Sequence, residues 1–392
     1  MLIWHRSRMV MTTHDERVLP VYLNGRFLRQ TLSGVQRFAT EISAGLVRQG
    51  VISEVVVPPA HKEERRDIRK SFGNIPVKEA GFASGHVWEQ TSLPWASADG
   101  LLVNLGNTAP LLARRQIVVI HDCGWASVPE AYSARFRTIY RVMQMALVAR
   151  GVRIITVSEF ARSEIMRHLG ARPDQVSVIP EGGEHIRSVP ADATVLAAND
   201  LRPGGYVLVV GNLVAHKNLR ILAGLGEKLE ARGLTLAIVG ASRDGIFQQQ
   251  GVDSMPRAAR YLGRVSDGAL RALYEHAACF VFPSRYEGFG LPAVEAMACA
   301  CPVVASDIPV LREICGDAAL FADPCSQNDF TRQVLRVFDE SGVAERLRRA
   351  GAARLLHYNW TQASSAMADI IATARCGAPA SSCSSFGMEA SR

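Results

Sequence analysis

Residues 280–300 read FVFPSRYEGFGLPAVEAMACA, and this stretch decides the fold. An apolar run ends near Pro283, a loop follows, and Pro292 stands where a helix begins, because proline is favoured at a first helical position. Gly288 and Gly290 let the backbone approach a ligand closely, and the free amides at a helix start attract anions. The stretch therefore predicts a strand–loop–helix unit with an anion site at the loop.

The rest of the chain alternates short apolar runs with longer helical patterns. Runs that predict strands lie at 18–23, 53–57, 100–103, 116–120, 152–157 and 176–179, and again at 206–210, 234–239, 278–282, 302–305 and 319–321. This alternation is typical of βαβ units with parallel sheets. We expect an α/β protein of two doubly wound, Rossmann-like domains facing a cleft, at 18–190 and 206–355. We also expect a linker at 191–205, a helix at 356–375 packing back towards the first domain, and a disordered tail at 376–392.

Composition excludes several classes of protein. Of the 392 residues, 48% are hydrophobic and 21% charged, which excludes a disordered chain or a coiled coil. The longest apolar stretch, 290–305, is interrupted by Glu295 and Pro302 and is too short to span a membrane. The eight cysteines show no zinc-ligand spacing, and no secretory signal opens the chain. We expect a cytoplasmic protein, or one peripheral to the inner face of the plasma membrane.

The positive charge is unevenly distributed. The net charge is +7, and residues 1–190 hold 24 basic and 17 acidic groups, against 20 of each in 191–392. A one-sided positive field favours an anionic partner, either a phosphorylated substrate or an acidic membrane surface. Because basic residues do not alternate with aromatic ones, we expect no nucleic-acid partner. The predicted helix 133–150 allows two interpretations: an ordinary packed helix, or a basic surface for lipid headgroups or a lipid-diphosphate acceptor.

A second interpretation of the deciding stretch is a dinucleotide site. Gly288, Gly290 and Ala293 match the pattern G-x-G-x-x-A, and Asp307 follows the next strand. In that pattern the first glycine directly follows the first strand of its domain, whereas here residues 284–287 intervene and the strand is a late one. We therefore disfavour a nicotinamide or flavin cofactor. A plain surface glutamate beside an ordinary helix is the other alternative.

The spacing of Glu287 and Glu295 resembles the E-x7-E element of the family 4 retaining glycosyltransferases, which have the GT-B fold. Six further segments resemble stations of that family in the same order. They are 24–37 (NGRFLRQTLSGVQR), 118–122 (VVIHD), 155–160 (ITVSEF), 178–183 (VIPEGG), 209–218 (VVGNLVAHKN) and 261–273 (YLGRVSDGALRAL). The resemblance implies transfer of a hexose, mannose favoured, from a nucleotide diphosphate sugar, with retained configuration and without metal or cofactor. The implied acceptor is a glycan or lipid-linked glycan of a surface polysaccharide or lipopolysaccharide.

The same resemblance implies roles for individual residues. His121 and Glu287 are expected at the transferring sugar and are the predicted catalytic residues. Glu295 is expected at the ribose of the donor. The other predicted donor-binding residues are Gly34, Asn212, Lys217, Val265, Gly290 and Leu291, with Lys217 and the amides of Gly290 and Leu291 at the diphosphate.

Two positions depart from the family's pattern. Asn212 stands where many relatives have arginine, so either Arg37 or the helix amides must do more at the diphosphate. Glu181 stands where relatives often have asparagine, which leaves the role of its turn open. A sugar-nucleotide epimerase or hydrolase, and a catalytically silent nucleotide-sugar-binding subunit, remain the alternative functions.

Overall fold

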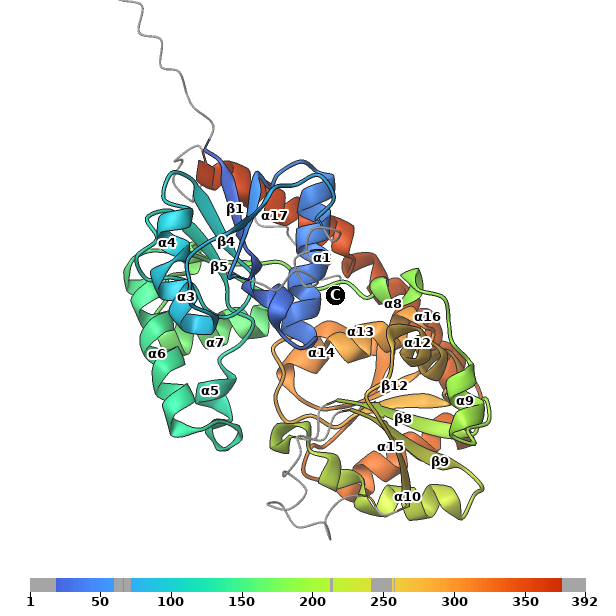
Figure 1. Ribbon diagram of the computed structural model, residues 1–392. Helices are drawn as coiled ribbons and strands as arrows, with labels where there is room; N and C mark the ends of the chain where they lie inside the picture. Colours follow the sequence, from blue (N-terminus) through green and yellow to red (C-terminus); the bar gives the residue numbers. More distant parts are fainter. Residues whose placement is uncertain are drawn as a thin grey trace, which may run out of the picture.

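The computed structural model describes residues 19–59, 66, 72–211, 214–240, 256 and 258–375. They form two α/β domains (Figure 1). The first contains a seven-stranded parallel sheet in the order β3-β2-β1-β4-β5-β6-β7, and the second a six-stranded parallel sheet in the order β10-β9-β8-β11-β12-β13. Both orders reverse direction beside the first strand of the domain, which is where doubly wound sheets bind ligands. The predicted fold class is confirmed.

The strands of the first domain are β1 (Val21–Asn24), β2 (Glu54–Val57), β3 (Val77–Glu79), β4 (Leu101–Asn104), β5 (Gln116–Val119), β6 (Arg153–Thr156) and β7 (Val176–Val178). Those of the second are β8 (Tyr206–Val210), β9 (Thr235–Val239), β10 (Ala259–Gly263), β11 (Cys279–Phe282), β12 (Val303–Ser306) and β13 (Ala319–Ala322). The apolar runs did not predict β3 or β10. Both are edge strands with no fully buried residue, so they lack the continuous apolar run of a central strand.

Helices cover both sheets. The first domain has α1 (Gly34–Arg48), α3 (Gly85–Thr91), α4 (Leu93–Ala96), α5 (Gly124–Ser127), α6 (Ala134–Ala149) and α7 (Glu159–Leu169). After α8 (His185–Ser188) and α9 (Thr194–Ala198), the second has α10 (Ala223–Glu230), α12 (Asp267–His276), α13 (Leu291–Ala298), α14 (Pro309–Cys315), α15 (Gln327–Asp339) and α16 (Val343–Arg354). Helix α9 lies inside the segment expected as a linker. No described helix is long and apolar enough to cross a membrane.

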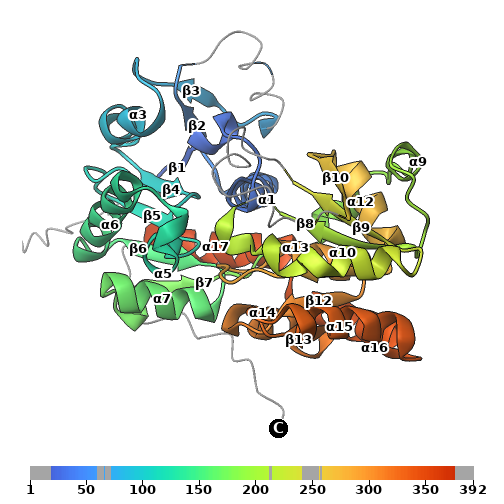
Figure 2. The ribbon, with the colours of Figure 1, turned by 90° about the horizontal axis from the view of Figure 1, so that it is seen from below.

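The last described helix, α17 (Trp360–Arg375), lies against α1 of the first domain, although it follows the second domain in sequence (Figures 1 and 2). The two helices approach closely at Gly45, where a Cβ atom would lie 2.3 Å from the Cβ of Ser364. Arg375 at the end of α17 also donates to the carbonyl of Leu19, 2.8 Å away. The predicted tail 376–392 lies outside the described residues.

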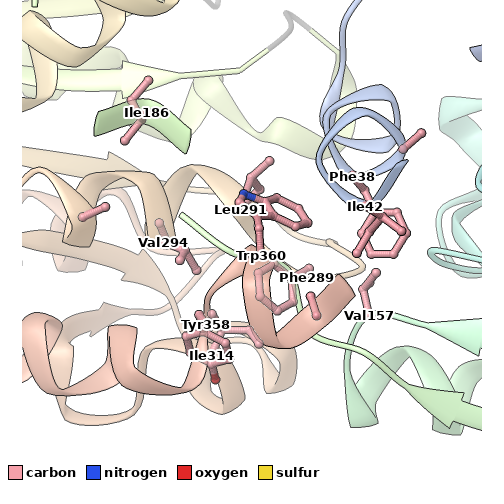
Figure 3. Close-up of a cluster of buried hydrophobic side chains, with 14 of the residues drawn as sticks. Phe38, Ile42, Val157, Ile186, Phe289, Leu291, Val294, Ile314, Tyr358 and Trp360 are labelled. Carbon is pink, nitrogen blue, oxygen red and sulfur yellow. The ribbon is translucent and has the colours of Figure 1, made fainter. Parts of the chain in front are cut away.

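One apolar core runs through both domains. In Figure 3, Phe38 and Ile42 of α1 face a group of C-terminal-half side chains that includes Phe289, Leu291 and Trp360. The rings of Phe38 and Trp360 meet edge to face, with centroids 6.0 Å apart. Because a shared core resists separation, the two domains hold the cleft between them in a defined arrangement.

Candidate active site

A cavity of about 480 Å³ lies between the domains and receives side chains from both. Eight of the nine predicted site residues line it: Gly34, His121, Lys217, Val265, Glu287, Gly290, Leu291 and Glu295. The ninth, Asn212, lies outside the described residues. A cleft at the carboxyl ends of two parallel sheets is the usual place for a ligand of an α/β protein.

The loop after β11 brings the start of α13 close to the first domain. A Cβ atom at Gly288 would lie 2.5 Å from the carbonyl oxygen of His121, so only glycine fits there. Gly290 has a positive φ of 107°, and a Cβ there would lie 2.8 Å from Leu311. With Gly290 as its N-cap, α13 begins at Leu291 and directs its free amides to the edge of the cavity.

Lys217 and Glu287 form an ion pair in this cavity. The Nζ of Lys217 lies 2.6 Å from Oε1 of Glu287, and both side chains are less than a fifth exposed. The ammonium also stands 5.5 Å from the ring centroid of Phe282. Asn218, which follows in a left-handed conformation, donates to the carbonyls of Pro283 and Pro324 and thereby fixes the turn that carries Lys217. A cation and a carboxylate thus lie beside the α13 amides.

His121 projects from the end of β5 on the opposite wall. Its backbone N–H donates to Oδ1 of Asn107 at 2.7 Å, and its Nε2 lies 3.1 Å from the carbonyl oxygen of Leu105. Since a carbonyl can only accept, Nε2 carries a proton. The ring meets Phe38 edge to face at 4.9 Å. These contacts fix the backbone and ring of His121 at the point where Gly288 touches it.

Glu181, for which no role is predicted, lies in the cavity. Its Oε1 lies 3.7 Å from Nδ1 of His121, and only 4% of the residue is exposed. Burial raises the pKa of the Glu181 carboxyl above 4.5, opposed by the nearby His121 and reinforced by the charge of Glu295. The pair His121–Glu181 therefore lines the cavity.

Two buried hydrogen bonds hold the carboxylate of Glu295, which is predicted to bind the ribose of the donor. Its Oε1 accepts from Nε2 of His185 at 3.0 Å, and its Oε2 accepts from the hydroxyl of Tyr274 at 3.2 Å. A carboxylate has about four acceptor positions, so two hydrogen bonds leave capacity for a ligand in the cavity. Sequence patterns could not reveal the contact with His185, because it joins residues 110 positions apart.

Three further cavity residues were not predicted. His216 precedes Lys217, and burial followed by the charge of Lys217 lowers the pKa of its imidazole below 6.5. Its buried Nδ1 has no hydrogen-bond partner among the described residues. Tyr132 and Asp267 also line the cavity. Arg37, considered as a replacement cation for the diphosphate, donates to Oδ2 of Asp267 across the cleft at 2.5 Å, so its guanidinium already has an acidic partner.

Buried polar residues extend the first-domain wall. The Nε of Arg26 lies 3.2 Å from Oε1 of Glu89, and its Nη2 donates to Thr108 at 2.7 Å. Glu89 also accepts from Asn24 at the end of β1. Asn24 also donates to Oδ1 of Asn104, so the network joins the ends of β1 and β4 to α3.

Comparison with known proteins agrees with this geometry. A family profile described as "Glycosyltransferase Family 4" matches residues 32–184, and one described as "Glycosyl transferases group 1" matches residues 201–354. The O-antigen chain mannosyltransferase B of Escherichia coli is 32% identical over 261 residues, covering 64% of this chain and 68% of the relative. The O-antigen chain mannosyltransferase RfbU of Salmonella typhimurium is 28% identical over 240 residues, covering 60% and 64%.

Among solved structures, Anabaena HepE in complex with UDP and glucose matches with a TM-score of 0.69 at 17% identity. That match covers 91% of this chain and 100% of the other, whereas the curated relatives are matched over about two thirds of their length. Identity this low shows a shared fold only. With the sequence relatives and both family profiles, the conclusion is that this chain belongs to the family 4 glycosyltransferases of GT-B fold.

Proposed function

We propose that this chain transfers a hexose, with mannose favoured, from a nucleotide diphosphate sugar to a glycan or lipid-linked acceptor of a surface polysaccharide or lipopolysaccharide. The observation that carries the proposal is the Lys217–Glu287 pair beside the start of α13, facing His121 across one cavity. The O-antigen mannosyltransferases among the relatives support the choice of sugar and acceptor.

The proposed reaction retains the configuration at the anomeric carbon. The bond from that carbon to the diphosphate oxygen breaks, and a bond to the acceptor hydroxyl forms on the same face. The acceptor's proton passes to the departing phosphate oxygen. Lys217 and the α13 amides oppose the charge that grows on the diphosphate, and Glu287 binds the sugar hydroxyls. The carbonyl of His121 stabilises positive charge on the sugar ring.

The first experiment measures transfer directly. GDP-mannose, GDP-glucose, UDP-glucose and ADP-glucose are each incubated with the full chain and a lipid-linked glycan acceptor, with and without chelator. We expect an acceptor-dependent product from one donor and little loss with chelator. Product without acceptor would favour the epimerase or hydrolase, and nucleotide binding without any product would favour the silent subunit.

We further propose that the outer face of α6 contacts an acidic membrane surface. Both views place α6 on the side of the first domain away from the second (Figures 1 and 2). Its residues Ile139, Val142 and Met145 are 45%, 60% and 41% exposed. Beside them, Arg137 and Arg141 line a 450 Å³ hollow and form no ion pair with a described residue. Exposed apolar side chains bordered by free arginines suit an interface with anionic headgroups.

Vesicle binding tests this contact. The double variant Arg137→Ala with Arg141→Ala should bind phosphatidylglycerol vesicles roughly thirtyfold more weakly than the parent chain, because each arginine near such a surface contributes about 1 kcal/mol. The matched control removes Arg332 and Arg349, which are also exposed but lie on the second domain. Equal binding by both double variants would contradict the proposed surface.

A further inference from the structure

A chain of buried hydrogen bonds joins the last described helix to the carboxylate of Glu295. The indole Nε1 of Trp360 donates to Nδ1 of His185 at 3.0 Å. Nε2 of His185 lies 3.0 Å from Oε1 of Glu295, and the Tyr274 hydroxyl lies 3.2 Å from Oε2. These four residues come from α17, α8, α13 and α12, and we call them the Trp360 relay.

The relay fixes the tautomer of His185. An indole N–H can only donate, so Nδ1 of His185 must be the accepting nitrogen. The proton of the neutral ring is then on Nε2, which directs it to Glu295. Without a donor at Nδ1, the opposite tautomer becomes less unfavourable and the buried Nδ1 loses its hydrogen bond. The indole N–H and the Glu295 carboxylate therefore favour the same tautomer, and Trp360 reinforces the hydrogen bond from His185 to Glu295.

All four residues of the Trp360 relay are buried from solvent. Trp360, His185, Tyr274 and Glu295 are 3%, 5%, 0% and 7% exposed. A buried carboxylate that loses a donor has little water to replace it, so it rotates towards another donor or takes up a proton. Burial raises the pKa of the Tyr274 phenol well above 10.0, which keeps its hydroxyl a donor at neutral pH. Glu295 thus has two permanent donors on its buried side.

The segment that carries His185 has no room to move away. A Cβ atom at Gly182 would lie 2.4 Å from the backbone N of Trp360, and one at Gly183 would lie 2.8 Å from the carbonyl oxygen of Val294. Glu184 accepts from the backbone N–H of Trp360 at 2.5 Å. The crossover between the domains is therefore clamped between α13 and the start of α17.

We propose that His185 is a positioning residue for Glu295, and that Trp360 acts through it to hold the carboxylate in the orientation that binds the nucleoside of the donor. The proposal rests on the proposed function, in which Glu295 contacts the ribose. Helix α17 packs on the first domain, and under this proposal it also belongs to the donor site of the second domain. Neither residue touches the reacting atoms, so the relay acts on donor binding and not on the bond-breaking step.

The experiment compares variants that keep or remove single hydrogen bonds. Trp360→Phe keeps an aromatic ring beside Phe38 and removes the N–H together with the volume of the second ring. His185→Leu removes both contacts, whereas His185→Gln retains one donor and one acceptor. GDP, UDP and ADP are titrated calorimetrically into each full chain, and donor KM and kcat are measured where transfer is detected.

We expect His185→Leu to raise the dissociation constant of the preferred nucleotide and the donor KM about tenfold, the usual effect of a hydrogen bond to a charged group. Trp360→Phe, which removes a hydrogen bond between neutral groups, should raise both about fivefold. Turnover should change less than about twofold, and His185→Gln should restore most of the affinity. Tyr274→Phe, which removes only the donor to Oε2, should weaken binding to a similar extent. A rise in KM without a matching fall in kcat, together with the recovery of affinity in His185→Gln, distinguishes a positioning role from a general loss of structure.

Ser364→Ala is the matched control, because it removes a 3.2 Å hydrogen bond from Gln49 to the same helix without touching the relay. It should leave nucleotide affinity unchanged. If the parent chain binds a nucleotide and the relay variants bind it equally well, the positioning role is wrong and the proposed function stands. The positioning role is also wrong if glutamine at position 185 restores no more affinity than leucine. If the parent chain binds none of the three nucleotides, both the positioning role and the proposed function are wrong.

Discussion

At the scale of single residues, the Lys217–Glu287 pair determines how much positive charge the donor site offers. In the structure the ammonium of Lys217 is 2.6 Å from a carboxylate, so part of its charge is already balanced. A bound diphosphate would compete with Glu287 for the same ammonium. In the proposed reaction, the interaction of Lys217 with the diphosphate would be strongest when the negative charge on the leaving group is greatest, which is near the transition state.

The first prediction concerns this pair. Lys217→Ala should lower kcat/KM at least about tenfold, because a charge-assisted hydrogen bond contributes about 1.5–3 kcal/mol. Glu287→Gln should depress kcat more than nucleotide affinity, since its expected partner is the sugar. Steady-state kinetics of both variants and of the double variant measure the coupling between the residues. Additive losses would show that the ion pair has no part in transfer.

The second prediction concerns Glu181. Its carboxyl has a folded-state pKa raised above 4.5 by burial; the contact with His121 opposes the rise and the charge of Glu295 adds to it. The stability that its protonated form contributes is fully present below pH 4.5 and is lost as pH rises through the folded pKa. The Glu181→Gln variant has no ionisable group at this position. Its melting temperature should therefore rise relative to that of the parent chain as the pH increases. Parallel melting curves at all pH values would contradict the raised pKa.

At the scale of elements, the start of α13 depends on a backbone contact between domains. The third prediction is that Gly288→Ala lowers activity at least about tenfold, since its Cβ would lie 2.5 Å from the carbonyl of His121 and must push the α13 loop out of place. Gly106→Ala is the control, because its Cβ would meet only Val35 at an ordinary 3.5 Å. Initial transfer rates at saturating donor compare the two; equal rates would mean that the loop adapts.

The sequence predicted the central elements well for a physical reason. Strands such as β5 and β11 are buried on both faces, so their sequences are mostly unbroken apolar runs. The edge strands β3 and β10 are half-exposed, and their sequences lack such a run. For the site, the family's spacing identified His121, Lys217 and Glu287. It could not identify His185, Trp360 or Asp267, because their partners are more than 100 residues away and only tertiary packing brings them together.

At the scale of the whole molecule, the domains are joined by polar contacts as well as by the shared core. Glu313 on α14 accepts from the backbone N–H groups of Glu159 and Phe160 at 2.8 and 2.9 Å, and so caps α7 of the other domain. Burial raises the pKa of the Glu313 carboxyl, although these two amides oppose the rise. A side chain of one domain therefore caps a helix of the other, in addition to the helix's own N-cap residue Ser158.

The fourth prediction is that Glu313→Ala destabilises the joined domains by about 1 kcal/mol, the usual loss for a helix cap. Calorimetry should show a lower melting temperature and a broader transition, as the domains unfold less cooperatively. Glu159→Ala serves as the comparison, because its exposed side chain pairs only with the neighbouring Arg162 among described residues. Indistinguishable traces for the two variants would show that the cap does not couple the domains.

The return of α17 to α1 also sets the order in which the chain can mature during synthesis. Within 206–354, the described residues form a sheet and its helices without a strand from outside this range, so this part can fold as soon as it leaves the ribosome. The first domain is made earlier, yet the α1 surface around Gly45 is covered only when residues 360–375 emerge. The first domain is thus translated first but completed last. Until α17 emerges, the apolar surface of α1 is uncovered and accessible to chaperones.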